Sequence, residues 1–473
     1  MEAAFGPGSP IFAQTTERLT RIFAEAGHVP QVAARFREWE NSQVQGSPDA
    51  TSFIQQTYIQ QTYLAILARL VARLFVTPKR PISNAEELLE VINVDYFTRR
   101  GIGNFGEGDL LSWLPLEGRW ELGLDDLVLE TVQGLADALA PHDFAEAPPG
   151  ILDSLYRPTP PRWLAEYVVE NELGLPGDSM LSMLDPACGT GTFLCAAIGA
   201  MFRAVAQRGG DPIDVLFEAP EKFRGMDPDP LAVTLARLNY LLAFGDQVQQ
   251  EHPPFLLPVY LADADQIPKS QHLGPDSQVV TLSTTAGEFP LPLPFIENPL
   301  MLDWVLGRLT NYMDGAQLRM HAQPEELAVQ EVLNAYFNYL TSSKPRTPVP
   351  DALTPQQADT LLETARMLVH LHIRGEGTLW LNMVQNLAAP AVFSHAEFDR
   401  ISGQGSSALL ETASASYLKS GGRAALLTSN ADATPAVITG TVRSVRLKVE
   451  GEPIPHGSSW ADAKAGVRVV EEP

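Results

Sequence analysis

Three acidic residues, Asp185, Asp227 and Asp263, each follow an apolar run that we expect to form a short buried strand. Because the carboxyl ends of parallel strands border the ligand crevice of an open α/β sheet, this spacing predicts three carboxylates around one crevice. A carboxylate in that place can bind ribose hydroxyls or a cationic amino group through charge-assisted hydrogen bonds. A turn would explain one acid after a strand, whereas three successive ones indicate a site for a nucleoside ligand.

The turn that follows the first acid, Asp185-Pro-Ala-Cys-Gly-Thr-Gly-Thr-Phe-Leu194, is rich in glycine. Gly189 and Gly191 can adopt positive φ angles and have no Cβ, so the backbone can approach a ligand closely. The apolar stretch from Phe193 to Ala206 predicts a helix directly after the turn. Strand, turn and helix form the first unit of a nucleotide-binding α/β fold. The dinucleotide fingerprint would need glycine where Leu194 stands, which disfavours a pyrophosphate ligand.

The run from Asp185 to Leu194 resembles the S-adenosylmethionine loop of class I methyltransferases, and most of all that of N6-adenine-specific DNA methyltransferases. The resemblance implies an α/β fold with a Rossmann-like class I methyltransferase core and S-adenosylmethionine as the cofactor. It also implies which residues of the turn contact the cofactor: Asp185, Pro186, Cys188, Gly189 and Gly191.

The same resemblance assigns roles to the two later acids. Asp227 is expected to bind the ribose hydroxyls, with Asp229 as the alternative or as a helix cap. Asp263 is expected to contact the adenine amino group of the cofactor.

A proline-rich segment, Tyr156-Arg-Pro-Thr-Pro160, precedes the first strand. In the family, a Tyr-Thr-Pro sequence opens a helix at this place and touches the methionine moiety of the cofactor. Here the three residue types are spread out. We expect Thr159 to cap the following helix, with prolines in its first turn, and to contact the cofactor. A helix cap alone is the simpler alternative.

The segment from Phe398 to Ser407 resembles the family's catalytic strand and loop, Phe-Asp-x-x-x-Gly-Asn-Pro-Pro-Trp, but departs from it where the chemistry takes place. Phe398, Asp399 and Gly403 are in register with the pattern. Gln404 occupies the position of the catalytic asparagine, Gly405 and Ser406 replace the two prolines, and Ser407 replaces the aromatic residue.

This departure predicts weak or absent methyl transfer by the chain alone. The target base must be flipped out of the duplex and its amino group held by a rigid acceptor under a stacked ring. The amide of Gln404 stands one methylene further out, and a misplacement of about 1 Å can lower the rate on the order of a hundredfold. Gln404 is therefore the catalytic candidate in a degenerate loop, and Tyr417 or Trp460 could replace the missing ring.

Composition limits the class of protein. Two cysteines, Cys188 and Cys195, in 473 residues indicate no disulfide framework, so we expect a cytoplasmic protein. The apolar stretch Tyr63–Val76 contains two arginines and is predicted to be a core-facing helix rather than a membrane span. His370 and His372 have no acidic residue beside them in sequence, so we expect a surface pair and no metal site.

The spacing of apolar residues and the positions of proline and glycine predict four segments. Residues 1–150 form a helical N-terminal domain, 151–270 the cofactor-binding half of the core, 271–397 a helical insertion, and 398–473 the remaining core strands and the tail. Within these segments, Phe97–Trp113 is expected to be a loop, and the Leu-Pro-Leu-Pro run at 291–294 is not expected to form a buried strand.

The leading functional hypothesis is methyl transfer from S-adenosylmethionine to adenine N6 in DNA, in restriction–modification or phage defence. The alternative is an inactive or truncated cofactor-binding subunit of a defence complex. A methyltransferase that acts on protein or on a small molecule is the third hypothesis. The departures from Gln404 to Ser407 separate the first hypothesis from the second.

The net charge of −24 predicts that the purified chain binds duplex DNA poorly without a recognition domain or a basic partner, since non-specific affinity comes from phosphate neutralisation. A fluorescence-anisotropy titration with a labelled duplex at physiological salt should show no saturation in the micromolar range. Micromolar, salt-sensitive binding would contradict this expectation.

Overall fold

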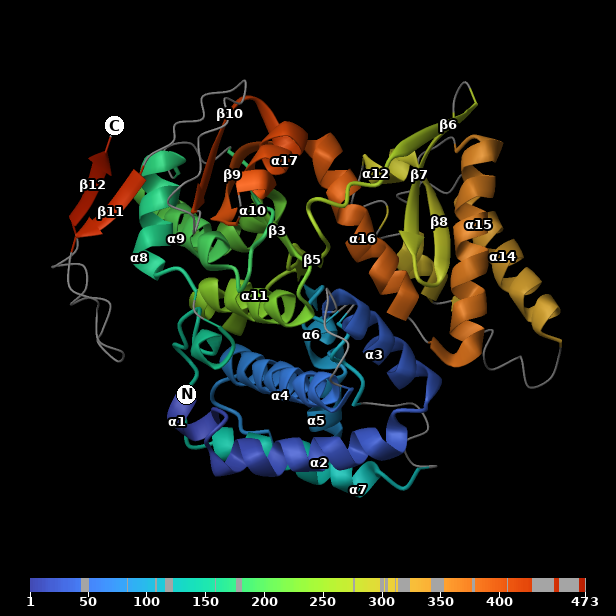
Figure 1. Cartoon of the computed structure of the whole chain (residues 1–473), viewed down its shortest axis with the longest axis horizontal. Helices are drawn as coiled ribbons and strands as arrows, with labels where there is room; N and C mark the ends of the chain where they lie inside the picture. Colours follow the sequence, from blue (N-terminus) through green and yellow to red (C-terminus); the bar gives the residue numbers. More distant parts are fainter. Residues whose placement is uncertain are drawn as a thin grey trace.

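The protein is a mixed α/β structure in three regions (Figure 1). N-terminal helices lie on one side of a central sheet, and an inserted region lies beyond the sheet's β5 edge. The computed structural model describes residues 1–43, 51–82, 84–106, 109–114, 122–157, 159–175, 181–274, 277–297, 302, 305–310, 312–313, 324–341, 353–376, 379–405, 407–427, 446–450 and 468–472.

The central sheet has five parallel strands in the order β10-β9-β2-β3-β5. Numbered along the chain from the β5 edge, this order is 3-2-1-4-5, as in the doubly wound sheet, and it reverses between β2 and β9. The expected α/β class is confirmed. The strands are β2 (Met183–Asp185), β3 (Phe223–Asp227), β5 (Val259–Leu261), β9 (Phe398–Gln404) and β10 (Leu418–Leu427).

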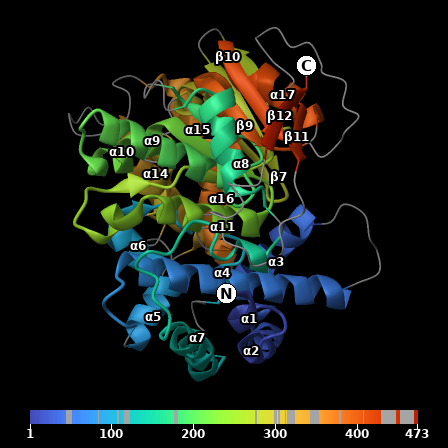
Figure 2. The same cartoon turned by 90° about the vertical axis from the view of Figure 1, so that its left-hand side faces the viewer.

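Helices cover the sheet in two groups. Helix α9 (Thr192–Gln207) packs against α11 (Pro230–Ala243) and α10 (Val215–Lys222), whereas α16 (Leu379–Ala396) packs against α17 (Ser407–Tyr417). The two groups arise because crossover connections have the same handedness, whereas the chain proceeds from β2 toward β5 on one side of the switch point and toward β10 on the other. Figure 2 shows α11 between the sheet region and the long N-terminal helix α4. This position explains why α11 is buried along almost its whole length.

The N-terminal region is helical, as expected, and is built around α4 (Thr51–Val76). The other helices are α1 (Glu2–Phe5), α2 (Pro10–Ala26), α3 (Pro30–Gln43), α5 (Ala85–Ile92), α6 (Asp95–Arg99) and α7 (Asp125–Leu139). Residues Phe53–Val76 are long and apolar enough to cross a membrane, but 83% of that window is buried inside the protein. The stretch therefore packs as a core helix.

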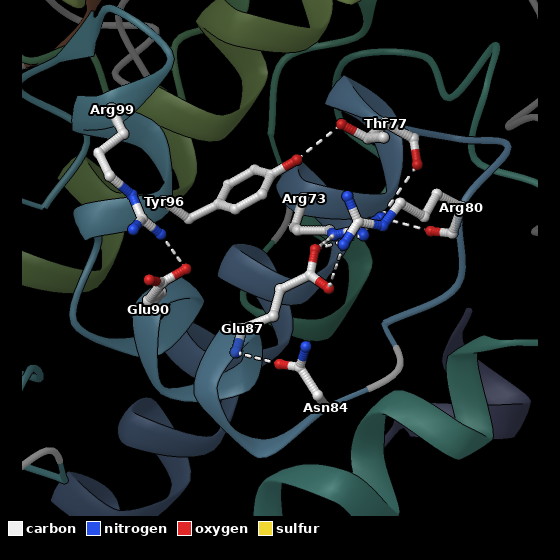
Figure 3. A network of polar contacts seen from close by, with 8 residues as sticks. All are labelled: Arg73, Thr77, Arg80, Asn84, Glu87, Glu90, Tyr96 and Arg99. Atoms are coloured by element: carbon white, nitrogen blue, oxygen red, sulfur yellow. Dashed lines mark hydrogen bonds and ion pairs between the residues drawn. The ribbon is translucent and has the colours of Figure 1, made fainter.

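The end of α4 is fixed by a polar network (Figure 3). Arg73 pairs with Glu87 and donates to the carbonyls of Thr77 and Arg80 at 3.0 and 2.6 Å. The side chain of Asn84 accepts the amide of Glu87 at 2.6 Å and so caps α5, as its position before an acidic turn predicts. The network joins α4 to α5 across the proline-rich turn.

Two short strands correct the sequence predictions. The expected loop at 97–113 contains the end of α6 and β1 (Ile102–Gly103), which pairs with β4 (Phe255–Leu256). The apolar run before Asp263, which was expected to form one strand, is therefore two strands, β4 and β5. Its first half leaves the central sheet because its backbone pairs with the N-terminal region.

The insertion was expected to be helical, but it also contains an antiparallel sheet in the order β6-β7-β8. Strand β8 ends in the proline-rich run that was predicted not to form a buried strand. Pro290 and Pro292 are accommodated because β8 is paired only with β7 and needs no amide donor on its other edge. The elements are β6 (Ser270–Gly274), β7 (Ser277–Thr284), β8 (Gly287–Pro292), α12 (Leu293–Ile296), α14 (Glu325–Thr341) and α15 (Pro355–Leu371).

A buried ion pair connects the N-terminal region to the core. Arg69 on α4 pairs with Asp109 at 2.5 Å, and both side chains are at most 2% exposed. Asp109 also accepts the amide of Leu111 at 2.8 Å and the hydroxyl of Thr234 on α11 at 3.4 Å. One carboxylate therefore holds α4, its own loop and α11 together.

We predict that Asp109→Ala lowers the free energy of unfolding by about 3–5 kcal/mol, because it leaves Arg69 buried and unpaired. Urea unfolding followed by circular dichroism measures the loss. Removing both partners in Arg69→Met/Asp109→Leu should restore part of it, and Glu17→Ala on the exposed surface of α2 should be neutral. A loss below 1 kcal/mol for Asp109→Ala would contradict this role.

Candidate cofactor site

The ends of β2, β3 and β5 are joined by backbone hydrogen bonds beside the switch point. The amide of Cys188 donates to the carbonyl of Met226 at 3.0 Å, and the amide of Ala262 donates to the carbonyl of Asp227 at 3.1 Å. Asp185, Asp227 and Asp263 consequently stand at neighbouring strand ends, as the sequence predicts.

The glycine-rich turn has the backbone that its glycines permit. Gly189 and Gly191 have φ angles of 54° and 83°, and Gly191 caps α9. A Cβ on Gly191 would lie 3.4 Å from Ala236 of α11, so the turn packs closely against this helix. A Cβ on Gly189 would lie 3.2 Å from the guanidinium of Arg157. The contacts of Gly189 and Gly191 with a cofactor remain predictions.

Asp185 is a fully buried carboxylate with one unused oxygen. Its Oδ1 accepts the amide of Ala187 at 3.3 Å, while its Oδ2 is buried and has no hydrogen-bond partner within the described part of the chain. Burial, reinforced by the negative charge of Asp227, raises the pKa of Asp185 well above 3.8. A cation placed at Oδ2 would reverse this shift, since it stabilises the ionised form.

Asp227 holds the turn in place. Its Oδ2 accepts the amide of Gly189 and its Oδ1 the amide of Asp229, both at 2.9 Å. Burial raises its pKa, although these two hydrogen bonds and the charge of Arg157 oppose the shift. Each oxygen keeps a further acceptor position for a hydroxyl.

Asp229 caps helix α11, which was one of the two roles expected for it. Its Oδ1 accepts the amides of Leu231 and Ala232 at 2.9 and 3.3 Å, and its Oδ2 is bonded to the hydroxyl of Tyr156. Asp263 is half-buried and accepts the amide of Asp265 at 3.0 Å, which is a turn contact. Its contact with the cofactor remains a prediction.

A buried network of hydrogen bonds, which was not predicted, also fixes the glycine-rich turn. Asp153 accepts hydrogen bonds from Thr190 at 2.9 Å and from Asn239 of α11 at 3.0 Å. Asn239 also donates to the carbonyl of Thr190 at 2.9 Å and accepts the amide of Gly150 at 2.7 Å. Asp153 lies 37 residues before Thr190, so no local pattern indicates the contact.

Thr159 belongs to this network and does not cap a helix. Its hydroxyl is hydrogen-bonded to Asp153, whereas α8 (Arg162–Tyr167) begins after Pro161 with no side-chain cap. Because Pro160 and Pro161 stand between Thr159 and the first helical residue, the hydroxyl is too early to reach the helix amides. Its contact with a cofactor remains a prediction.

The candidate catalytic residue Gln404 is exposed at the carboxyl end of β9, on the other side of the switch point. The amide of Gly405 donates to the carbonyl of Leu427 at 3.1 Å, and a Cβ on Gly405 would lie 2.5 Å from Leu409. The family's proline would lose this hydrogen bond and would require the side chain of Leu409 to shift.

Tyr417 cannot supply the missing stacking ring in this structure. It is fully buried, and its hydroxyl donates to the carbonyl of Ala264 at 2.7 Å. The other candidate ring, Trp460, and Ser406 of the catalytic loop lie outside the described residues.

The remaining candidates for a site are separate from the crevice. The described residues contain no group of three or more metal-ligating side chains. His370 pairs with Glu325 at 3.1 Å. His372 is buried, and its two ring nitrogens have no hydrogen-bond partner among the described residues, so the expected surface pair is wrong for His372. A cavity of about 260 Å³ has no predicted cofactor residue in its lining, which is Asn104, Leu256, Tyr260, Gly307, Thr310, Leu381, Asn382, Gln385 and Asn386.

Comparisons with known proteins do not assign a family. No family model matches the chain, and no curated protein matches it. Three solved structures share low similarity with it: the ATP-dependent Type ISP restriction-modification enzyme LlaBIII bound to DNA (TM-score 0.29, 12% identity), a nuclease-deletion mutant of the Type ISP enzyme LlaGI with a DNA substrate mimic (0.28, 14%), and a DrdV–DNA complex (0.25, 14%).

The matches cover 54%, 56% and 54% of this chain but only 17%, 21% and 26% of those chains. The chain thus spans about a quarter or less of each of them.

Asp185 gives a stability prediction with a definite sign. Its raised pKa means that the folded protein holds a proton that the unfolded chain releases above pH 3.8, so Asp185 lowers the stability of the ligand-free protein as pH rises. Asp185→Asn should stabilise the protein at pH 8 by roughly 1 kcal/mol, which raises the Tm of a chain of 473 residues by about 1 °C. It should also reduce the fall of the Tm as pH rises above 3.8.

Differential scanning calorimetry on the ligand-free protein provides the measurement. Asp246→Asn, which changes an exposed acid, is the matched control and should follow the wild type at every pH. A lower Tm for Asp185→Asn at pH 8 would show that the carboxylate is compensated in the ligand-free state.

Proposed function

We propose that the chain binds S-adenosylmethionine at the crevice formed by β2, β3 and β5 and is the methyltransferase core of an enzyme that methylates adenine N6 in DNA, in restriction–modification or phage defence. The observation that carries the proposal is the buried Oδ2 of Asp185 at the switch point, which has no hydrogen-bond partner among the described residues. A buried carboxylate without a partner is costly, so a cationic ligand group at this place accounts for its presence.

The chain's own residues fit such a ligand. Asp185 can accept hydrogen bonds from the α-ammonium group, and Asp227 retains acceptor positions for the ribose diol. The amide of Gly189 donates to Asp227 and so holds the turn in place. When bound, S-adenosylmethionine supplies a methyl group on a sulfonium, which is a second positive charge beside these acids. The adenine, DNA and defence assignments come from the resemblance of the sequence motifs.

A second candidate, a cofactor-binding subunit with little activity of its own, is favoured by the loop after β9. Gln404 is exposed, and Gly405 occupies a space that proline cannot enter without displacing Leu409. The adenine amino group would therefore meet a longer and less rigid acceptor than in the family. Activity would then depend on a partner or on another aromatic side chain.

Calorimetric titration with S-adenosylmethionine tests the cofactor assignment. We expect saturable binding to the wild type and to Asp246→Asn. Asp185→Asn should bind about tenfold to a hundredfold more weakly, since a hydrogen bond between charged groups contributes about 1.5–3 kcal/mol. Equal affinity in all three proteins would contradict the assignment of Asp185, and no binding at all would contradict the proposed function.

Transfer of a radiolabelled methyl group to adenine-containing DNA separates the two candidates. The wild type should be slow, and Gln404→Asn/Ser407→Trp, which leaves Gly405 in place, should be faster by about tenfold or more. Rapid transfer by the wild type with no gain in the variant would contradict this interpretation of the loop. Slow transfer by both proteins, relieved only by a partner fraction, would favour the subunit.

A further inference from the structure

Arg157 is held against the glycine-rich turn. One terminal nitrogen of its guanidinium lies 3.2 Å from the position that a Cβ on Gly189 would occupy. The guanidinium carbon also lies 4.9 Å from the centroid of the Tyr156 ring, and the hydroxyl of Tyr156 is bonded to Asp229. The planar group is therefore oriented by an aromatic face that is itself fixed to the cap of α11.

No hydrogen bond or ion pair within the described part of the chain uses the guanidinium of Arg157. Its charge is nevertheless close enough to lower the pKa of Asp227, Asp153 and Cys188 against the effect of burial. The side chain is exposed, so its donors face solvent at the edge of the crevice. It is thus a positioned cation, beside several acids, with its hydrogen-bonding capacity unused.

The proposed cofactor contains one anionic group that the acids cannot bind. Its amino-acid end has an α-ammonium and an α-carboxylate on the same carbon atom. If Asp185 accepts the ammonium, the carboxylate must lie within a few ångströms of the same turn. Three acids at the strand ends would repel it unless a cation were placed there. A guanidinium is well suited, because it donates two parallel hydrogen bonds to a carboxylate.

We propose that Arg157 binds the α-carboxylate of the cofactor and makes the site selective for nucleosides that carry a complete amino acid, an inference that rests on the proposed function. Asp185 would then bind the α-ammonium and Arg157 the α-carboxylate of the same amino-acid group. Arg157 stands within the segment Tyr156–Pro160, where the tyrosine, threonine and proline of the family pattern are spread out.

The test compares two ligands that differ only in the carboxylate. S-adenosylmethionine and its decarboxylated form are titrated calorimetrically into the wild type, Arg157→Ala, Arg157→Lys and Arg162→Ala. Arg162 is the matched control, because it is an exposed arginine five residues away that pairs with Glu166 on its own helix. Thermal unfolding of each variant in the absence of ligand shows that it is folded.

We expect the wild type to bind S-adenosylmethionine at least tenfold more tightly than the decarboxylated form. Arg157→Ala should weaken only the binding of S-adenosylmethionine, so that the two affinities come within about twofold of each other. Arg157→Lys, which keeps the charge and loses the paired donors, should retain part of the preference. Arg162→Ala should behave as the wild type.

Two results would overturn the inference while leaving the proposed function intact. Equal weakening of both ligands by Arg157→Ala would show that Arg157 only compensates the acids or holds the turn. Unchanged affinity for both ligands would show that it does not contribute to the site. Absence of binding to the folded wild type would instead overturn the proposed function, and this inference with it.

Discussion

The burial of the Asp185 carboxylate is the constraint on which the rest of the site depends. Taking a carboxylate out of water is unfavourable unless its oxygens are paired, and here one oxygen has only a backbone amide while the other has no partner in the described structure. The surrounding structure makes this arrangement possible. Asp227 and the network of Asp153 and Asn239 fix the turn, so the carboxylate cannot move to water without breaking several buried hydrogen bonds.

The frame around the turn is rigid for a further reason. Gly191 brings the turn against α11, and α11 is in turn held by Thr234 to the ion pair of Arg69 and Asp109. The helical N-terminal region is therefore connected to the crevice at the strand ends through one helix. A buried acid with an unused oxygen, held by a network of hydrogen bonds around it, is the pattern expected of a preorganised binding site.

The parts of the site that could be predicted are those encoded by local pattern. The acids at the strand ends and the glycine-rich turn follow from alternation of apolar runs with turn residues, and both were found in the expected elements. Contacts between distant segments could not be predicted in this way, as with Asp153 and Asn239, which are 86 residues apart. Packing also changed one expectation, since the proline-rich β8 pairs as an edge strand.

The central claim, that a cationic ligand group binds at buried Asp185 and lowers its raised pKa, is tested most directly by counting protons. Calorimetric titrations of S-adenosylmethionine near neutral pH, in buffers of different ionisation enthalpy, give the number of protons released on binding. The account predicts net release by the wild type, because the ligand's ammonium lowers the raised pKa of Asp185, and markedly less release by Asp185→Asn. Binding with the same proton count in both proteins would contradict it.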